Sequence, residues 1–256
     1  MELVNYNWML VFMRLSAFLY VLPFFSTINF PHMMRIALGA LAAMLIAPLL
    51  PPFPLAQLKF FSLIGVMFQE VSVGLLLGFL ARMIFYAVEL AGNIISTEMG
   101  LNLASVMNPA EGQTVQAPGM MLFFLATIVM LTLDLHHWIL MGFERTYLVL
   151  PIGGAHLNSA LFEAIVAQTA RIFMVALQIS APMIAVSFVV TMIFAVLSRA
   201  VPQMNVFAES FGFRIAAGLI VFGFTLQLTA IHVMNHLRRL PDDLLVIAQM
   251  IGGGRL

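Results

Sequence analysis

The chain has 256 residues, of which 62% are hydrophobic and only 9% are charged, whereas soluble domains average about 45–50% apolar and about 25% charged residues. Eleven basic side chains balance eleven acidic ones, so no net charge attracts nucleic acid. The sequence has no cysteine, which excludes disulfides, thiolate metal sites and thiol catalysis. This composition predicts a membrane protein, or a protein buried in an assembly that resembles a membrane interior.

Segments without charged residues divide the chain into candidate helical spans. They are residues 15–34, 36–58, 112–133, 172–198 and 215–237. Each is long enough to cross about 30 Å of hydrocarbon as a helix. Pro23 and Pro31 interrupt the first segment, and a proline-rich turn at 48–54 ends the second one early. The N-terminus carries no basic cluster before its apolar run, so we expect no removable signal peptide.

A further apolar stretch, residues 59–107, contains four ionisable side chains. These are Glu70, Arg82, Glu89 and Glu98. As one helix the stretch would be about 74 Å long, so we expect it to break near Gly74–Gly78 or Arg82, or else to extend well beyond the lipid. The Gly74 and Gly78 pair is also a small-xxx-small pattern, which permits the close approach of another helix.

Loops are expected where proline, glycine and asparagine gather, at 108–118, 151–158 and 198–205. Between them the pattern is apolar throughout and has no alternation typical of strands. The sequence therefore predicts an all-α protein with six or seven apolar helical segments in hairpins, several of them broken by proline or charge.

Five residues of the long apolar stretch lie on one helical face. They are Arg82, Glu89, Asn93, Ser96 and Gly100, separated by 7, 4, 3 and 4 positions. Such a polar face in an apolar helix turns toward water, a partner helix or a pore rather than lipid. Three interpretations stay open: a hydrogen-bonded seam between helices, a channel-lining or subunit-contact face, and a proton relay through Glu89.

A second polar stripe ends in His232 and His236, which have the i,i+4 spacing of two metal ligands. The stripe lacks the glutamate of the HExxH arrangement and lies just before Arg238, so we interpret it as a solvated helix end. No metal site is predicted here.

Adjacent His136 and His137 point about 100° apart on a helix, so they cannot easily chelate one ion together. With Asp134 and the neighbouring Trp138 they are interpreted as a membrane boundary. The sequence has no phosphate-binding loop, nucleophile elbow or zinc-protease motif. We therefore predict no catalytic residue, no cofactor and no enzyme activity.

Two motifs resemble the FliR family of flagellar export proteins, which includes the homologous export-gate subunit of virulence type III secretion systems. Residues 95–113 read ISTEMGLNLASVMNPAEGQ, and residues 198–207 read SRAVPQMNVF. The resemblance extends over nearly the whole chain, with departures at Asn108, Leu135 and Gly212. The second motif supplies four turn residues of interest: Arg199, Pro202, Gln203 and Asn205.

The resemblance implies an export gate at the centre of the flagellar basal body in the bacterial inner membrane. In that family the protein assembles with FliP and FliQ around a channel for unfolded protein subunits, FlhB wraps the core and FlhA lies beneath it. By this resemblance residues 1–162 form a FliP-like helical portion, and residues 163–256 form a FliQ-like hairpin with a C-terminal tail.

The resemblance also implies a plug. In the family, the loop that follows the Met-Gly-x-x-x-Ala motif closes the pore, and it corresponds to residues 106–118. Glycine and proline in this segment favour a movable backbone. The plug residues expected here are Met107, Asn108, Pro109, Glu111, Gly112, Gln113 and Pro118.

Three other functions compete with a flagellar gate. A virulence-type secretion subunit shares the same motifs. An ion-coupled small-solute transporter would use intramembrane carboxylates as its ion site, but the chain shows no repeated halves of the kind common in such proteins. A purely structural membrane subunit would nucleate an assembly without contacting the substrate.

Overall fold

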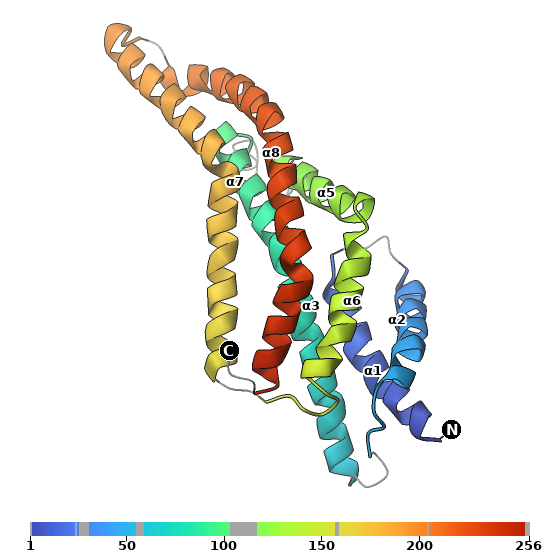
Figure 1. Cartoon of the computed structure of the whole chain (residues 1–256). Coiled ribbons are helices and arrows are strands. Elements are labelled where there is room, and N and C mark those ends of the chain that lie inside the picture. The colour runs from blue at the N-terminus through green and yellow to red at the C-terminus, as the bar shows by residue number, and fades with distance from the viewer. Residues whose placement is uncertain are drawn as a thin grey trace. The chain divides into compact units, whose positions relative to one another are not determined.

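The computed structural model describes residues 2–23, 25, 31–54, 59–102, 117–156, 159–203 and 205–253. Within these ranges every regular element is helical (Figure 1), which confirms the predicted all-α class. The elements are α1 (Glu2–Val21), α2 (His32–Ile46), the short 3-10 helix η1 (Ala47–Leu49), α3 (Phe60–Met99), α5 (Ala117–Thr132), α6 (Leu135–Val149), α7 (Ser159–Ala200) and α8 (Val206–Ile251).

Four helical stretches in the described ranges have the length and hydropathy of membrane spans. They are His32–Leu49, Phe60–Met99, Leu161–Ala200 and Ala208–Ile251. Helices α5 and α6 form a fifth span if they are counted together across the bend between them. This number of apolar helices agrees with the membrane protein predicted from composition.

The chain divides into two compact units. The first contains Met1–Met83, Asp134–Thr169 and Arg238–Leu256, and the second contains Ile84–Leu133 and Ala170–Leu237. Helices α3, α7 and α8 each contribute residues to both units.

Proline sets several helix boundaries where the sequence predicted them. Helix α1 ends at Val21, just before Pro23, and α2 begins directly after Pro31. The helical stretch of α2 and η1 ends at Leu49, inside the predicted proline-rich turn. Because proline fixes φ and lacks an amide hydrogen, it interrupts helices at these points.

In the first unit, α3 does not break at its glycines. A Cβ added at Gly74 would lie 2.1 Å from the carbonyl oxygen of Arg14, and one at Gly78 would lie 2.8 Å from that of Phe18. The two glycines therefore let α1 approach α3 closely. Of the two alternatives expected for this stretch, a break near Gly74–Gly78 or Arg82 is wrong, because α3 continues for 40 residues. Its length of about 60 Å exceeds the roughly 30 Å of hydrocarbon in a bilayer, as the other alternative expected.

In the second unit, α7 and α8 form a hairpin (Figure 1). The rings of Phe194 and Phe213 lie 5.3 Å apart, and Arg214 donates a hydrogen bond of 3.1 Å to the Thr191 hydroxyl. Residues 201–203 and 205 form the connection that the sequence predicted. Its last residue, Asn205, accepts a hydrogen bond from the Ala208 amide at 3.3 Å and caps α8.

Helix α8 is longer than the sequence indicated. It continues past Arg238 and through Pro241 to Ile251, so His232 and His236 lie within the helix rather than at its end. The predicted solvated helix end at this pair is wrong. In the first unit Gly142 of α6 lies against Pro241, where an added Cβ would be only 2.9 Å from the proline Cα atom.

Candidate functional site: a buried ion pair and the polar face of α3

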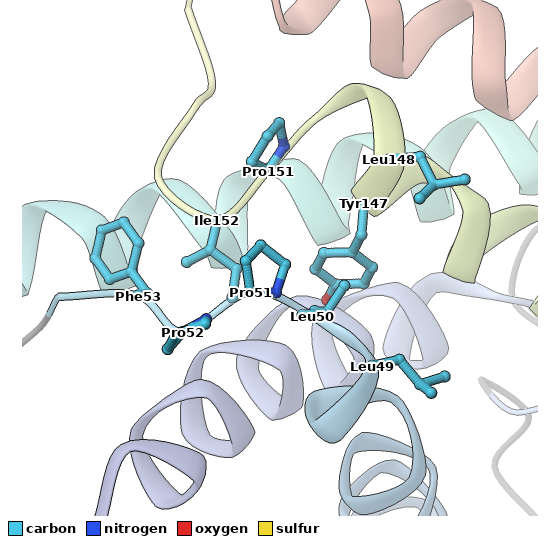
Figure 2. Close-up of a pocket in the computed structure, with 9 residues that line it drawn as sticks. All are labelled: Leu49, Leu50, Pro51, Pro52, Phe53, Tyr147, Leu148, Pro151 and Ile152. Carbon is cyan, nitrogen blue, oxygen red and sulfur yellow. The ribbon is translucent and has the colours of Figure 1, made fainter.

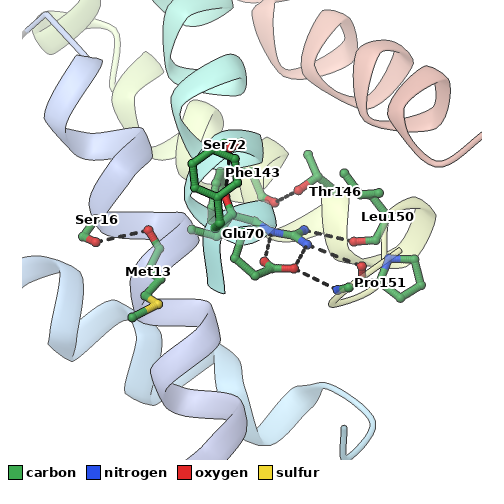
Figure 3. A network of polar contacts seen from close by, with 11 residues as sticks. Met13, Ser16, Glu70, Ser72, Phe143, Thr146, Leu150 and Pro151 are labelled. Carbon is green, nitrogen blue, oxygen red and sulfur yellow. Dashed lines mark hydrogen bonds and ion pairs between the residues drawn. The ribbon is translucent and has the colours of Figure 1, made fainter. Parts of the chain in front are cut away.

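The first unit encloses an ion pair between α1 and α3 (Figure 3). Arg14 Nε donates to Glu70 Oε2 at 2.6 Å, and Nη2 donates to Oε1 at 2.9 Å. The two side chains are 0% and 1% exposed. A bidentate, desolvated pair of this kind combines strong hydrogen bonds with a fixed geometry.

The same pair holds the connection that follows α6. Arg14 Nη1 donates to the Leu150 carbonyl at 2.9 Å, and Nη2 also reaches the Pro151 carbonyl at 3.4 Å. Glu70 Oε1 accepts the Gly153 amide at 2.9 Å. Because the remaining polar atoms of both side chains find backbone partners, the cost of burying the two charges is offset. The pair therefore fixes α1, α3 and the end of α6 to one another.

Tyr147 contacts Arg14 of this ion pair and also lines an apolar pocket, which is shown in Figure 2. The Arg14 guanidinium carbon stands 4.3 Å from the centre of the Tyr147 ring, in the geometry of a cation–π contact. The pocket has a volume of about 290 Å³, and it is lined by Leu49, Leu50, Pro51, Pro52, Phe53, Tyr147, Leu148, Pro151 and Ile152. The lining residues carry no charged side chain, and the one polar side-chain group among them is the Tyr147 hydroxyl, which is buried without a hydrogen-bond partner in the described residues.

Sequence reasoning missed the pairing itself. It noticed Glu70 as a charge in an apolar stretch, but it did not consider Arg14 as its partner. The two residues are 56 positions apart, so no helical spacing connects them. The available signal was the presence of an acid and a base in two mainly apolar segments, since buried charges in membrane proteins pair with one another.

The polar face of α3 meets more than one environment. In the first unit Arg82 donates to the Val21 carbonyl at 3.4 Å. In the second unit Glu89 is exposed, Asn93 is half-buried and Ser96 is fully buried. Gly100 has φ +77°, and an added Cβ there would lie 2.5 Å from the Phe211 ring. Four of the five residues lie in α3, whereas Gly100 follows its end at Met99, so the predicted single face is wrong at Gly100. The four residues do not lie on one common surface.

The carboxamide oxygen of Asn93 and the hydroxyl of Ser96 are buried without a hydrogen-bond partner in the described parts of the chain. Nearby, Gly92 of α3 lies against α5, where an added Cβ would be 2.1 Å from the Gly119 Cα atom. Two glycines at one crossing bring the helices into backbone contact.

Most of the predicted plug lies outside the described residues. This applies to Met107, Asn108, Pro109, Glu111, Gly112 and Gln113. Pro118 is described and is buried in the first turn of α5. In the family turn motif, Arg199, Pro202, Gln203 and Asn205 are all exposed around the connection between α7 and α8.

Asp134, His136 and His137 lie closer together than their helical spacing indicated. Their potential ligand atoms fall within 4.8 Å of one another, and the two imidazole centres are 4.1 Å apart. Asp134 has φ 54° and approaches His137 Nδ1 at 3.6 Å. The expected divergence of the two histidines is therefore wrong, whereas their role as a membrane boundary stays a prediction.

The described residues define a class: a helical membrane protein held by a buried ion pair and by glycine-mediated helix contacts. Residues 6–240 match the family of bacterial export proteins, family 1. The chain belongs to this family.

Three similar proteins illustrate the relationship. The chain is 30% identical over 231 residues to the flagellar biosynthetic protein FliR of Bacillus subtilis, an alignment that covers 89% of this chain and 88% of that protein. The FliR of Escherichia coli is 29% identical, with 88% and 85% covered. The FliR of Caulobacter vibrioides is 29% identical, with 91% and 93% covered.

Proposed function

We propose that the chain is a subunit of the flagellar type III protein export gate, and that it forms with FliP and FliQ the channel through which unfolded flagellar subunits pass. The observation that carries this proposal is the family match over residues 6–240. The similar proteins quoted above are all named for flagellar biosynthesis, which favours a flagellar over a virulence system.

The exposed apolar side chains of the second unit support the proposal that this chain is a subunit of a larger assembly. Phe224 of α8 is 82% exposed and Val196 of α7 is 70% exposed, and other large apolar side chains on both helices are also exposed. Many large exposed apolar side chains on one pair of helices indicate a surface that lipid or other subunits cover. In the proposed gate, FliP and FliQ subunits cover much of it.

The first unit argues against the transporter alternative. Glu70 is the one buried carboxylate in the described residues, and Arg14 already neutralises it at 2.6 Å. An ion-coupled transporter needs an acidic group that can exchange an ion or a proton along a pathway. Glu70 is instead enclosed by a guanidinium and a backbone amide. Its role is therefore structural, because these bonds hold α1 and the connection after α6 against α3.

The proposal includes the domain organisation and the wider assembly. Residues 1–162 form a FliP-like portion and residues 163–256 form a FliQ-like hairpin with its tail. FlhB and FlhA are the further partners, and the location is the inner membrane at the centre of the flagellar basal body. The α7–α8 hairpin supports the second of these portions.

We also propose that residues 106–118 plug the closed channel, and that the polar face of α3 contacts neighbouring subunits or the pore wall. Replacing residues 110–116 by a glycine-serine linker is expected to raise ion conductance through the assembled gate. The measurement is single-channel recording of the reconstituted complex. An unchanged conductance in a correctly assembled complex would remove the plug assignment.

Native mass spectrometry tests the gate proposal as a whole. The chain is expressed with FliP and FliQ from the same bacterium, and the complex is extracted in detergent. The expected result is one discrete complex with a single copy of this chain and several copies of each partner. A monomer or homo-oligomer that binds neither FliP nor FliQ would contradict the proposal.

A further inference from the structure

Arg35 is a buried arginine without an acidic partner in the described residues. It lies in the first unit, in the first turn of α2, and is only 7% exposed. No carboxylate of the described residues pairs with it, and its buried Nε atom has no hydrogen-bond partner there. An unpaired guanidinium removed from water is costly. Arg14, the other buried arginine of this unit, has Glu70.

The surroundings of Arg35 show what kind of counter-ion fits. Its guanidinium stands 5.3 Å from the centre of the Tyr20 ring, and Tyr20 is itself 61% exposed. Together they line an open groove of about 340 Å³. The rest of the groove is largely apolar, with walls that include Met13, Ile36, Val71 and Leu75.

The position of Arg35 along α2 determines its depth in the lipid bilayer. The stretch His32–Leu49 has the length of a membrane span, and Arg35 lies three residues from its start, which is about 5 Å along the helix. An arginine there reaches the level of lipid phosphates. The first turn of α2 contains no acidic residue, so the positive end of the helix dipole adds to the arginine charge.

We propose that the groove between α1, α2 and α3 binds an anionic phospholipid. The lipid phosphate pairs with the Arg35 guanidinium beside Tyr20, and an acyl chain lies along the apolar wall that Ile36, Val71 and Leu75 provide. Charge complementarity selects the occupant. A zwitterionic lipid brings a choline cation with its phosphate and leaves the net positive charge of the site uncompensated, and a free phosphate leaves the apolar wall uncovered.

Native mass spectrometry of the detergent-purified full chain tests the site. Phosphatidylglycerol or phosphatidylcholine with identical acyl chains is titrated in, and the retained adducts are compared. We expect phosphatidylglycerol to be preferred by at least about fivefold, and Arg35→Gln to abolish that preference. The exposed Arg145 provides the matched control, since Arg145→Gln removes an equal charge and is expected to keep the preference.

A second variant separates the apolar wall from the charge. Ile36 is 51% exposed, so Ile36→Trp fills the groove without disturbing the core. We expect this variant to lose phosphatidylglycerol while it keeps the melting temperature of the wild type. The same measurement on Arg35→Gln shows whether that chain is folded.

Five outcomes would overturn the proposal. Four of them are equal retention of the two lipids by the wild type, an unchanged preference in Arg35→Gln, unchanged phosphatidylglycerol binding in Ile36→Trp, and displacement of the lipid by equimolar inorganic phosphate. A fifth is the absence of bound phosphatidylglycerol from the complex with partner subunits, because a partner carboxylate would then occupy Arg35.

Discussion

The two units of this protein use apolar helices in different ways. In the first, Arg14 and Glu70 are fully enclosed and their hydrogen bonds are satisfied within the chain. In the second, the α7–α8 hairpin leaves large side chains such as Phe224 and Val196 mostly exposed. The first unit also exposes large apolar side chains, such as Phe61 at 84%, so both units need other molecules to cover them. What distinguishes the first unit is the buried ion pair that holds its helices together.

This contrast has an energetic basis. A buried ion pair contributes little net stability, but the loss of one partner is strongly destabilising. An exposed apolar face does the reverse, because it adds almost nothing to the isolated chain and much to an assembly. Substitutions in the two regions should therefore give opposite results in assays of folding and assembly.

The largest effect on folding is expected at the ion pair. Glu70→Ala leaves the Arg14 charge buried and unpaired, which is expected to lower stability by about 3–5 kcal/mol. Thermal unfolding in detergent measures the loss. Glu89→Ala, at an exposed position of the same helix, is the control and should change stability by no more than about 0.5 kcal/mol.

A double variant sharpens this prediction. Replacing both members of the pair, with Arg14→Met and Glu70→Leu, removes the two charges together and should recover most of the stability lost in Glu70→Ala. If the double variant is as unstable as the single one, the unpaired charge is not the cause of the loss.

A smaller loss of stability is expected at Gly74, where α3 contacts α1 beside the ion pair. Gly74→Ala places a methyl group 2.1 Å from the Arg14 carbonyl oxygen, so α1 must move, at a cost of about 1–3 kcal/mol. Gly65→Ala, on the same helix with nothing within 4 Å of the added carbon, should be neutral or stabilising because alanine favours helix. Equal melting temperatures for the two variants would exclude a tight contact at Gly74.

The smallest effect is expected at the start of α8. Asn205→Ala removes the cap on the Ala208 amide and should cost about 1 kcal/mol. Gln203→Ala, in the same connection, should cost less. Hydrogen exchange of the first turn of α8 measures this local change, and equal exchange in both variants would show that the cap is unimportant.

Local chemistry explains why the sequence predicted some parts of this fold. Proline acts on its own neighbours, so the ends of α1 and η1 and the start of α2 could be predicted. The connection between α7 and α8 followed in the same way from Pro202 and Asn205. Composition alone indicated that the helices belong to a membrane protein.

Other features depend on contacts between distant segments. The continuity of α3 through Gly74 and Gly78 depends on α1, which packs against those glycines. The partner of Glu70 lies 56 positions away. The extension of α8 through Pro241 accompanies its contact with Gly142. The small-xxx-small pattern of Gly74 and Gly78 predicts that some helix approaches closely there, but it does not identify α1. The partners of Glu70 and Pro241 have no local signature, so a single sequence could not supply them.

The most direct test of this account is photo-crosslinking from the exposed hairpin within the assembled gate. A photoreactive residue replaces Phe224, which is 82% exposed, and in a control it replaces the fully buried Phe143. We predict that Phe224 crosslinks to a FliP or FliQ subunit when both are co-expressed, whereas Phe143 crosslinks only within the chain. If Phe224 gave no protein crosslink in cells that contain both partners, the hairpin would not be a subunit interface, contrary to the account.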